Sequence, residues 1–235
     1  MGKISRKLHA VSINTRKNSA PCEFDKLFAR NVPHILEAIF LTLECKSFRS
    51  CLMVNKKWNK FLMSDSFITK AESTFDKWLS TASFKGHPGD VKLMLNMGIN
   101  PDIPDKECGG WNAMFFAASK GHKDVVKVLL DKGSNPNWID ERNMSVIAKA
   151  SNNGHEDVVK LLLDGGADPN LGFVCETLPL HNAAYHGYKN IVKLLIERGA
   201  DVAKKDSYGR TALNMAEIAL VDPEGMMKLI KEYLS

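Results

Sequence analysis

One short pattern recurs four times along the chain, and it constrains the fold more than any other feature. Its clearest copy is GHEDVVKLLLDGGADPN at residues 154–170, and related stretches begin at Gly86, Gly121 and Gly187. Successive copies start 35, 33 and 33 residues apart. Self-similarity at such a period is the signature of stacked repeats, in which each unit buries its apolar surface against its neighbours.

Each copy predicts a pair of helices followed by an extended finger. Small residues such as Ala183-Ala184 precede the glycine turn and would let two helices approach closely. The second helix carries apolar residues at helical spacing, as in residues 158–163, and glycine then ends it. An Asn-Pro or Asp-Pro pair leads into the finger. The pattern therefore predicts an all-α fold for this part of the chain.

The repeats resemble ankyrin repeats over about residues 77–235. The family's T-P-L-H tetrad is matched best at residues 178–181 (LPLH), and more weakly at residues 112–115 and 211–214. The resemblance implies a helical solenoid with β-hairpin fingers in a domain spanning residues 80–235. We expect about five units, near 77–105, 106–139, 140–172, 173–205 and 206–235.

Residues 31–62 form a second region, which the repeats never resemble. Pro33 would start a helix, and apolar residues at helical spacing predict three short helices in this segment. So short a segment cannot bury that much apolar surface by itself. Either it folds back on the repeats as a helical cap, or a partner covers it.

The same segment resembles an F-box, whose form is a proline-led helix with an I-F pair and a second helix with C-x-x-V-x-K-x-W. Departures are His34, where an acidic residue is common, and Asn55, where Cys is frequent. The resemblance implies docking on a Skp-type adaptor, and through it on a cullin-RING ubiquitin ligase. The expected adaptor-binding residues are Pro33, Leu36, Ile39, Phe40, Leu43, Cys51, Val54 and Trp58.

The remaining segments are a basic tail and a junction. Residues 1–30 hold seven Lys/Arg against two Asp/Glu, while the rest of the chain is balanced. Such a polar, basic stretch is typical of a disordered arm. Residues 63–79 contain no Gly or Pro and predict a helical junction.

The composition indicates the cellular compartment in which the chain works and the class of partner that it can have. The five cysteines are odd in number and include no C-x-x-C pair, so neither a disulfide framework nor a zinc ribbon is indicated. No apolar run approaches the ~18 residues of a membrane span. We expect a cytoplasmic or nuclear protein without a membrane partner.

The sequence contains no recognisable catalytic, metal-binding or cofactor-binding motif. His155-Glu156 begins like a zinc-protease H-E-x-x-H, but Val159 stands where the second histidine must be. No P-loop, G-x-S-x-G or dinucleotide fingerprint is present. We expect no catalytic, metal or cofactor-binding residue and no enzymatic activity.

The ankyrin resemblance implies that finger tips and the exposed side of each first helix bind a target protein. Residues that depart from the repeat pattern at such positions are the candidates, although packing between fingers is an equal alternative for any one of them. They are Trp111, Lys120, Glu141, Arg142, Met144, Asn153, Val174, Thr177, Tyr185, His186, Tyr208 and Arg210.

Two hypotheses follow for the whole chain. In the first, it is a non-catalytic substrate receptor of a cullin-RING ligase, in which the F-box-like segment binds the adaptor and the repeats bind a target. In the second, it is an interaction scaffold with no role in ubiquitin ligation. Nucleic acid is not expected as a partner, and the chain is expected to be a monomer outside its complex.

Overall fold

The computed structural model describes residues 77–96, 98–172 and 177–234, which all belong to one compact unit. A helical segment at 77–84 precedes the labelled helices. These are α7 (Pro88–Asn96), η1 (Lys106–Cys108), α8 (Ala113–Lys120), α9 (Lys123–Asp131), α10 (Val146–Asn152), α11 (Glu156–Asp164), α12 (Pro179–His186), α13 (Lys189–Glu197), α14 (Ala212–Glu217) and α15 (Pro223–Glu232).

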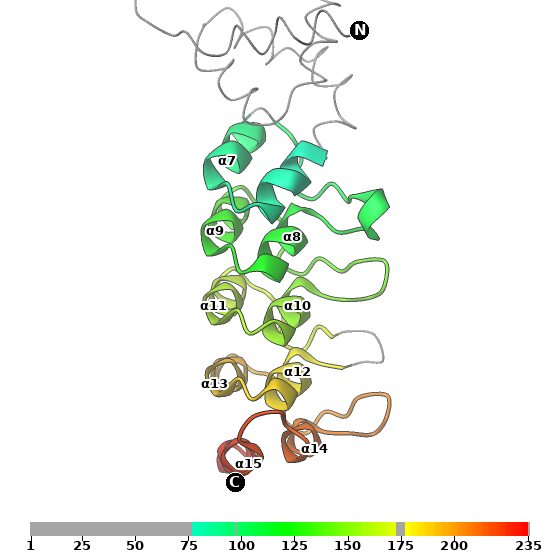
Figure 1. The fold of residues 1–235 in the computed structure, drawn as a ribbon, viewed down its shortest axis with the longest axis vertical. Coiled ribbons are helices and arrows are strands. Elements are labelled where there is room, and N and C mark those ends of the chain that lie inside the picture. The colour runs from blue at the N-terminus through cyan, green and yellow to red at the C-terminus, as the bar shows by residue number, and fades with distance from the viewer. Residues whose placement is uncertain (1–76, 97, 173–176, 235) are drawn as a thin grey trace, which may run out of the picture. The chain divides into compact units, whose positions relative to one another are not determined.

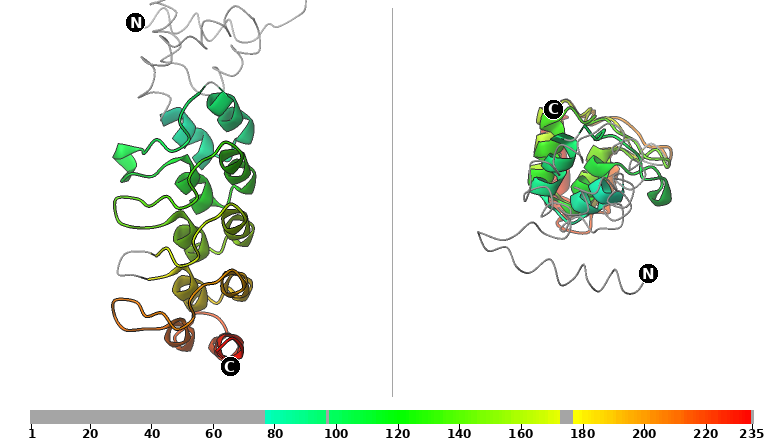
Figure 2. Two further views of the ribbon diagram at one scale, coloured as in Figure 1. Left: turned by 180° about the vertical axis from the view of Figure 1, so that it is seen from behind. Right: turned by 90° about the horizontal axis from the view of Figure 1, so that it is seen from above.

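The helices are arranged in pairs that stack on one another (Figure 1). In each pair an inner helix lies beside the fingers, and an outer helix lies on the far side (Figure 2). The inner helices are the segment 77–84, α8, α10, α12 and α14, and the outer helices are α7, α9, α11, α13 and α15. The expected helical solenoid is thus present in the described residues, as the 33-residue period predicted.

The core repeats with the sequence period. Within the outer helices, two apolar positions are fully buried in each of four consecutive units. They are Val91, Val126, Val159 and Val192 at the first position, and Met94, Leu129, Leu162 and Leu195 at the second. Packing between neighbouring units covers apolar faces that one helix pair could not cover alone.

Polar side chains start the inner helices. The Asn112 side chain accepts a hydrogen bond from the backbone N–H of Phe115 at 2.9 Å, and Ser145 caps α10 in the same way through Ala148. Each satisfies an N–H group that has no partner within its helix. The weak tetrad at residues 112–115 therefore still supplies the cap.

The glycine turns interlock successive units. Gly121 has φ +74°, and the ring of His155 from the next unit lies directly against it. The His155 Nε2 atom is 3.2 Å from the Ser119 carbonyl oxygen, and His122 makes the same contact to Phe84 at 2.9 Å. A side chain at Gly121 would occupy the space that the ring fills. The histidines are thus structural contacts between units.

The fingers differ from the β-hairpins that the resemblance implied, so that expectation is wrong for the described residues. They contain no strand there, and pairing is limited to isolated bridges between Asp105 and Trp111 and between Ile139 and Ser145. An aspartate closes the tip instead: Asp140 Oδ1 accepts from the backbone N–H groups of residues 142 and 144. This local side-chain turn replaces the ladder of a longer hairpin.

Asparagine amides join the bases of successive fingers. Asn137 donates from Nδ2 to the carbonyl oxygen of Gly166 and accepts at Oδ1 from the N–H of Asp168, at 3.2 and 2.8 Å. Asn170 repeats both bonds with the next finger, at 3.0 and 2.8 Å. Each amide is therefore a bridge between units that uses both of its polar atoms.

Three predicted regions fall outside the described residues. They are the basic tail (1–30), the F-box-like segment (31–62) and the junction (63–79), apart from residues 77–79. Those three residues belong to the first inner helix, in which Leu79 is buried.

Candidate functional site

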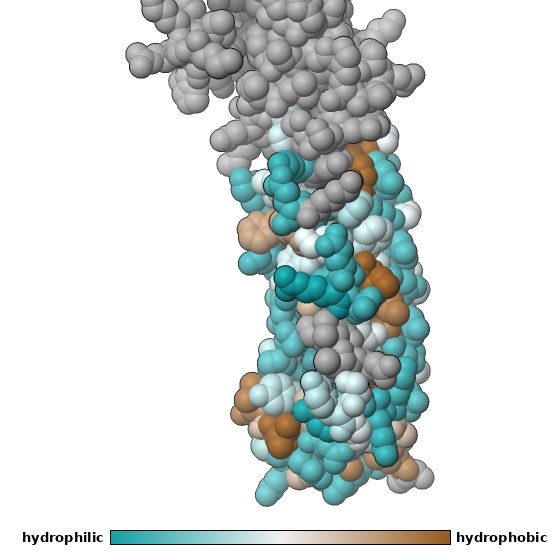
Figure 3. All heavy atoms as spheres, turned by 90° about the vertical axis from the view of Figure 1, so that its right-hand side faces the viewer, coloured by the Kyte–Doolittle hydropathy of each residue, from teal (hydrophilic) through white to brown (hydrophobic). Residues whose placement is uncertain are grey.

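The finger side of the stack is the surface on which the predicted target-binding residues lie. Figure 3 shows this side as mostly hydrophilic, with apolar residues gathered in small, separate groups. The inner helices and the fingers supply it. We describe it from the first units to the last.

Trp111 anchors an aromatic cluster at the start of α8. Its ring centroid lies 4.5 Å from that of Phe115 and 5.3 Å from that of Phe116. Phe116 in turn meets Phe84 of the preceding unit edge-on at 6.2 Å. The Trp111 Nε1 atom donates to Asp140 Oδ2 at 3.0 Å, which fixes the half-buried indole against the second finger.

Two lysines lie over these rings. The Lys120 Nζ atom is 4.6 Å from the ring centroid of Phe84, and the Lys149 Nζ atom is 5.6 Å from that of Trp111. Cations within about 6 Å of an aromatic centroid are attracted by the electrons of the ring face. The predicted residues Trp111 and Lys120 therefore belong to one continuous group.

The predicted residues of the second finger differ in how exposed their side chains are. Glu141 and Arg142 are exposed at the tip. Met144 is only 8% exposed, because the turn closed by Asp140 directs it into the stack, so its assignment as a contact residue is wrong. This finger therefore exposes only its polar tip to a partner, and Met144 is not part of that surface.

On the middle units, the predicted residues form a set of polar and aromatic contacts. The Asn153 side chain donates from Nδ2 to the Ser119 carbonyl oxygen at 2.8 Å, so this residue links two units. His186 Nε2 lies 3.2 Å from the Asn152 side-chain oxygen, and its ring stacks on Tyr188 at 5.6 Å. Tyr185 is half-buried and meets the ring of His186 edge-on. Tyr185 and His186 remain partly accessible, whereas the Asn153 amide is committed to the scaffold.

The fourth finger presents an aromatic residue with a cation. Tyr208 is 68% exposed, and the guanidinium carbon of Arg210 lies 4.8 Å from its ring centroid. Arg210 also bonds to Asp206 through Nε at 2.9 Å. Burial alone would raise the pKa of Asp206, but hydrogen bonds from Arg210 and Tyr208 outweigh it and lower that pKa. Arg210 is thus both a scaffold residue and a surface residue.

His181 bonds to the backbone of this finger. Its Nδ1 atom accepts from the Leu178 N–H at 3.1 Å, so Nε2 carries the proton and donates to the Arg210 carbonyl oxygen at 3.0 Å. Burial lowers the pKa of His181, against the opposing effect of these carbonyl contacts. The residue is therefore a neutral structural histidine at pH 7.

One predicted set lies wholly outside the described residues, and the other lies partly outside them. Val174 and all eight adaptor-binding residues lie outside the described residues, and Thr177 is half-buried at the end of its finger. The structure brings Trp111 and Lys120 together and, separately, Tyr185 with His186 and Tyr208 with Arg210.

Several surface residues were missed by the sequence reasoning. Phe84 is 45% exposed, and Ile218, Leu220 and Val221 in the α14–α15 loop are 55%, 63% and 60% exposed. The repeat register held a signal for two of them. Phe84 and Ile218 stand two residues before the turn position, as Tyr185 does.

The described residues also bear on whether the chain holds an enzyme or metal site. Residues 77–96, 98–172 and 177–234 contain no group of three His, Cys, Asp or Glu that could hold a metal ion. Cys108 is exposed, and partial desolvation, with the nearby charges of Asp105 and Glu107, raises its thiol pKa, which makes it a poor nucleophile at neutral pH. None of the helices described is long and apolar enough to cross a membrane.

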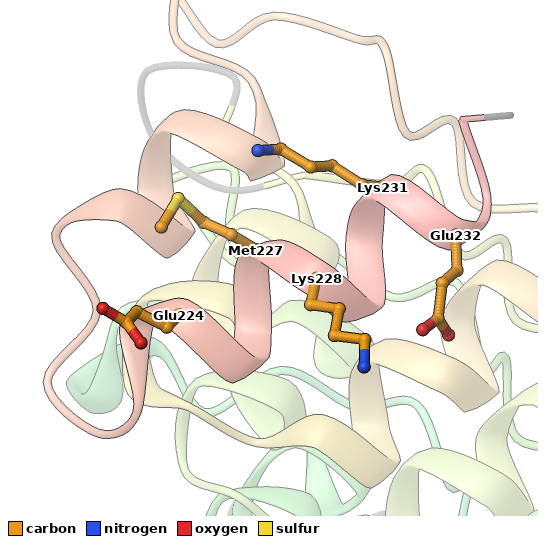
Figure 4. Close-up of a pocket in the computed structure, with 5 residues that line it drawn as sticks. All are labelled: Glu224, Met227, Lys228, Lys231 and Glu232. Atoms are coloured by element: carbon orange, nitrogen blue, oxygen red, sulfur yellow. The ribbon is translucent and has the colours of Figure 1, made fainter.

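One shallow cavity lies along α15. Its lining residues are Glu224, Met227, Lys228, Lys231 and Glu232. All five come from one helix, and Figure 4 shows that their side chains point in different directions along it. No set of converging groups is formed there.

Comparison with known proteins identifies the repeats. Family models described as ankyrin repeats match residues 79–173 and residues 180–216, which together are more than half of the chain. No curated protein matched the chain. Ankyrin repeats are modules of protein–protein interaction, and residues 1–76 matched no family model. The chain belongs to the ankyrin-repeat family.

Proposed function

We propose that this chain is a non-catalytic receptor that holds a target protein on the finger side of its repeats. The observation that carries the proposal is the mixture of accessible aromatic and cationic residues on that side. Trp111, Tyr208 and Arg210 are of the residue types that most often anchor interfaces, and a lysine lies over the ring of the first of them. The opposite, outer-helix side pairs several of its charges between neighbouring units, as between Lys123 and Asp157.

The finer proposal is that residues 31–62 deliver the bound target to a ubiquitin ligase. Its support is the F-box resemblance of the sequence, namely Pro33, Ile39-Phe40, Val54 and Trp58 at the family's spacing. These residues would dock on a Skp-type adaptor and through it on a cullin. The chain would then act in the cytoplasm or nucleus, where such ligases work.

Proximity is the mechanism in this proposal. The chain supplies effective concentration and orientation to a target that another protein modifies. It needs no bond-making group of its own. Fold resemblance alone does not establish such a role, so the adaptor contact must be measured directly.

Binding of the full chain to a purified Skp-type adaptor tests the finer proposal. We expect the wild-type chain to bind, and the Leu36→Asp, Trp58→Ala double variant to lose binding, because an apolar anchor is replaced by a charge and a large ring is removed. A matched control is Lys92→Glu on α7, which changes a charge on an exposed outer helix. Absence of wild-type binding, or equal binding by the double variant, would contradict the ligase role.

A plain interaction scaffold is the second candidate and is equally open. It requires only the finger-side surface, and in it residues 31–62 would cap the repeats. A chain that captures target protein through the fingers but fails to bind the adaptor would be this scaffold. The two candidates therefore differ in one binding experiment and share the target surface.

A further inference from the structure

A strip of aromatic rings with a lysine at each end crosses the first three units. We call it the aromatic–lysine strip, made of Phe84, Phe116, Trp111, Lys120 and Lys149. The rings form a continuous chain of contacts, with centroids 6.2 Å apart from Phe84 to Phe116 and 5.3 Å apart from Phe116 to Trp111. Lys120 lies over the first ring and Lys149 over the last.

The strip is held rigidly. Phe116 is 8% exposed and forms its base, while the Trp111 indole is fixed by its hydrogen bond to Asp140. Phe84 remains 45% exposed. A fixed, partly exposed ring costs little conformational entropy when a partner packs on it.

Among the residues that the structure describes, the two lysines have no carboxylate partner. Within residues 77–96, 98–172 and 177–234, neither Lys120 nor Lys149 takes part in an ion pair, whereas Lys123 pairs with Asp157 and Lys189 pairs with Asp222. Their ammonium groups rest on ring faces, where cation–π attraction holds them in place. Two positioned cations beside an exposed apolar ring favour a ligand that carries both negative charge and apolar surface.

The same geometry disfavours a nucleic acid. A base needs an open ring face to stack on, and Trp111 is half-buried and already contacted by Phe115, Phe116 and Lys149. The carboxylate of Asp140 lies at the indole, and exposed Glu141 follows it in the finger. A nucleic acid carries a negative charge at every nucleotide and would bring phosphates against these carboxylates, whereas a peptide can place its few carboxylates at the two lysines alone.

We propose that the aromatic–lysine strip binds an acidic segment of the target protein, with carboxylates paired to Lys120 and Lys149 and an apolar side chain packed on Phe84. The inference rests on the proposed function and adds to it the chemistry of the partner. It makes the first three units the anchoring part of the finger side. The exposed Tyr208 at the fourth finger would then contact a different part of the target.

Selection of short random peptides on the full-length chain tests the inference. We expect the selected peptides to be enriched in Asp and Glu next to Leu, Ile or Phe. Their affinity should fall about tenfold or more in the Lys120→Glu, Lys149→Glu double variant, because attraction becomes repulsion. The matched control is Lys92→Glu with Lys193→Glu, which makes the same charge change on exposed positions of α7 and α13. Thermal unfolding of both double variants checks that each remains folded.

The outcomes separate this inference from the proposed function. Peptides that bind the finger side but are not acidic, or whose affinity is unchanged in Lys120→Glu, Lys149→Glu, would overturn the inference and leave the receptor function intact. A single-stranded oligonucleotide that binds the wild type and not this variant would also overturn it, in favour of nucleic acid. If no finger-side substitution weakens the binding of any peptide or protein, the proposed receptor function itself is wrong.

Discussion

Two rows of residues run along the stack only two positions apart, and they differ in what they contact. The turn row faces the next unit: its glycines Gly86, Gly121, Gly154 and Gly187 lie against His122, His155, Tyr188 and Val221. The surface row precedes it by two residues and changes at each unit, as Phe84, Ser119, Asn152, Tyr185 and Ile218; Ser119 is buried, and the other four are partly or largely exposed. Its two ends are exposed apolar residues, at 45% and 55%.

The difference shows which positions the fold restricts. A turn-row residue must adopt a positive φ and leave room for a ring, so glycine recurs there. A surface-row residue has no such restriction and can vary with the partner. Regularity therefore marks scaffold, and departures from it mark the candidate surface. The following predictions test that division, starting with the largest effect.

The Gly121→Ala substitution should destabilise the protein most. Alanine at φ +74° costs about 1–2 kcal/mol, and its Cβ would lie 2.6 Å from His155 Nδ1. We expect the free energy of unfolding to fall by about 3 kcal/mol in urea titration. The control is Gly133→Ala, where φ is +80° but nothing lies within 4 Å of the added Cβ. Equal losses in the two variants would show that the contact between units adds nothing.

The Asn137→Ala substitution should have the next largest effect. It removes the bonds to Gly166 and Asp168 and leaves those backbone groups without their side-chain partner. We expect a loss of about 1–2 kcal/mol in the free energy of unfolding. Amide exchange at Asp168 should become faster, while that at Asp201, which Asn170 protects, should change less. Unchanged exchange at Asp168 would contradict the bridging role.

His181 should make stability depend on pH in a mildly acidic window. Its pKa is lowered in the folded state, so the unfolded chain binds a proton first as the pH falls below about 6.5. Stability is then complete above that pH and declines as the pH falls toward the folded-state value. The His181→Gln variant, measured at pH 7.5 and pH 5.5, should show a smaller difference than the wild type. Asp206, whose pKa is also lowered, loses its contribution only at more acidic pH.

Tyr208→Ala should leave stability nearly unchanged, within about 0.5 kcal/mol, because the ring is 68% exposed. Its effect should appear in target binding, measured by affinity capture from cells. A large loss of stability would show that Tyr208 stabilises the scaffold, contrary to its assignment as a surface residue. Unchanged capture would show that the fourth finger is not part of the binding surface.

The sequence could predict the scaffold because its physical causes repeat. The spacing of Val126, Leu129, Val159 and Leu162 reflects burial between units, and it gave the helix pairs. The sequence could not exclude β-hairpins in the fingers, because a strand forms only where residues pair along the whole finger. A signal was nevertheless present: Asp140 and Asp206 occupy equivalent finger positions, and each closes its tip through side-chain bonds.

The candidate surface was less predictable, because contacts between units create it. Trp111 and Lys120 were predicted from their departure from the pattern, but Lys149 joins them only through the stacking of α10 on α8. Met144 departs from the pattern too, yet the turn at Asp140 buries it. A departure thus identifies a candidate, and the direction of the side chain decides whether it can reach a partner.

The central claim is that the finger side binds a target protein and the outer side does not. Quantitative affinity capture with the full chain tests it most directly, using Trp111→Ala with Tyr208→Ala on the finger side and Lys92→Glu with Lys193→Glu on the outer side. We predict that the proteins captured by the wild type are lost from the first variant and retained by the second. Recovery of the same proteins in the same amounts by both variants would contradict the claim.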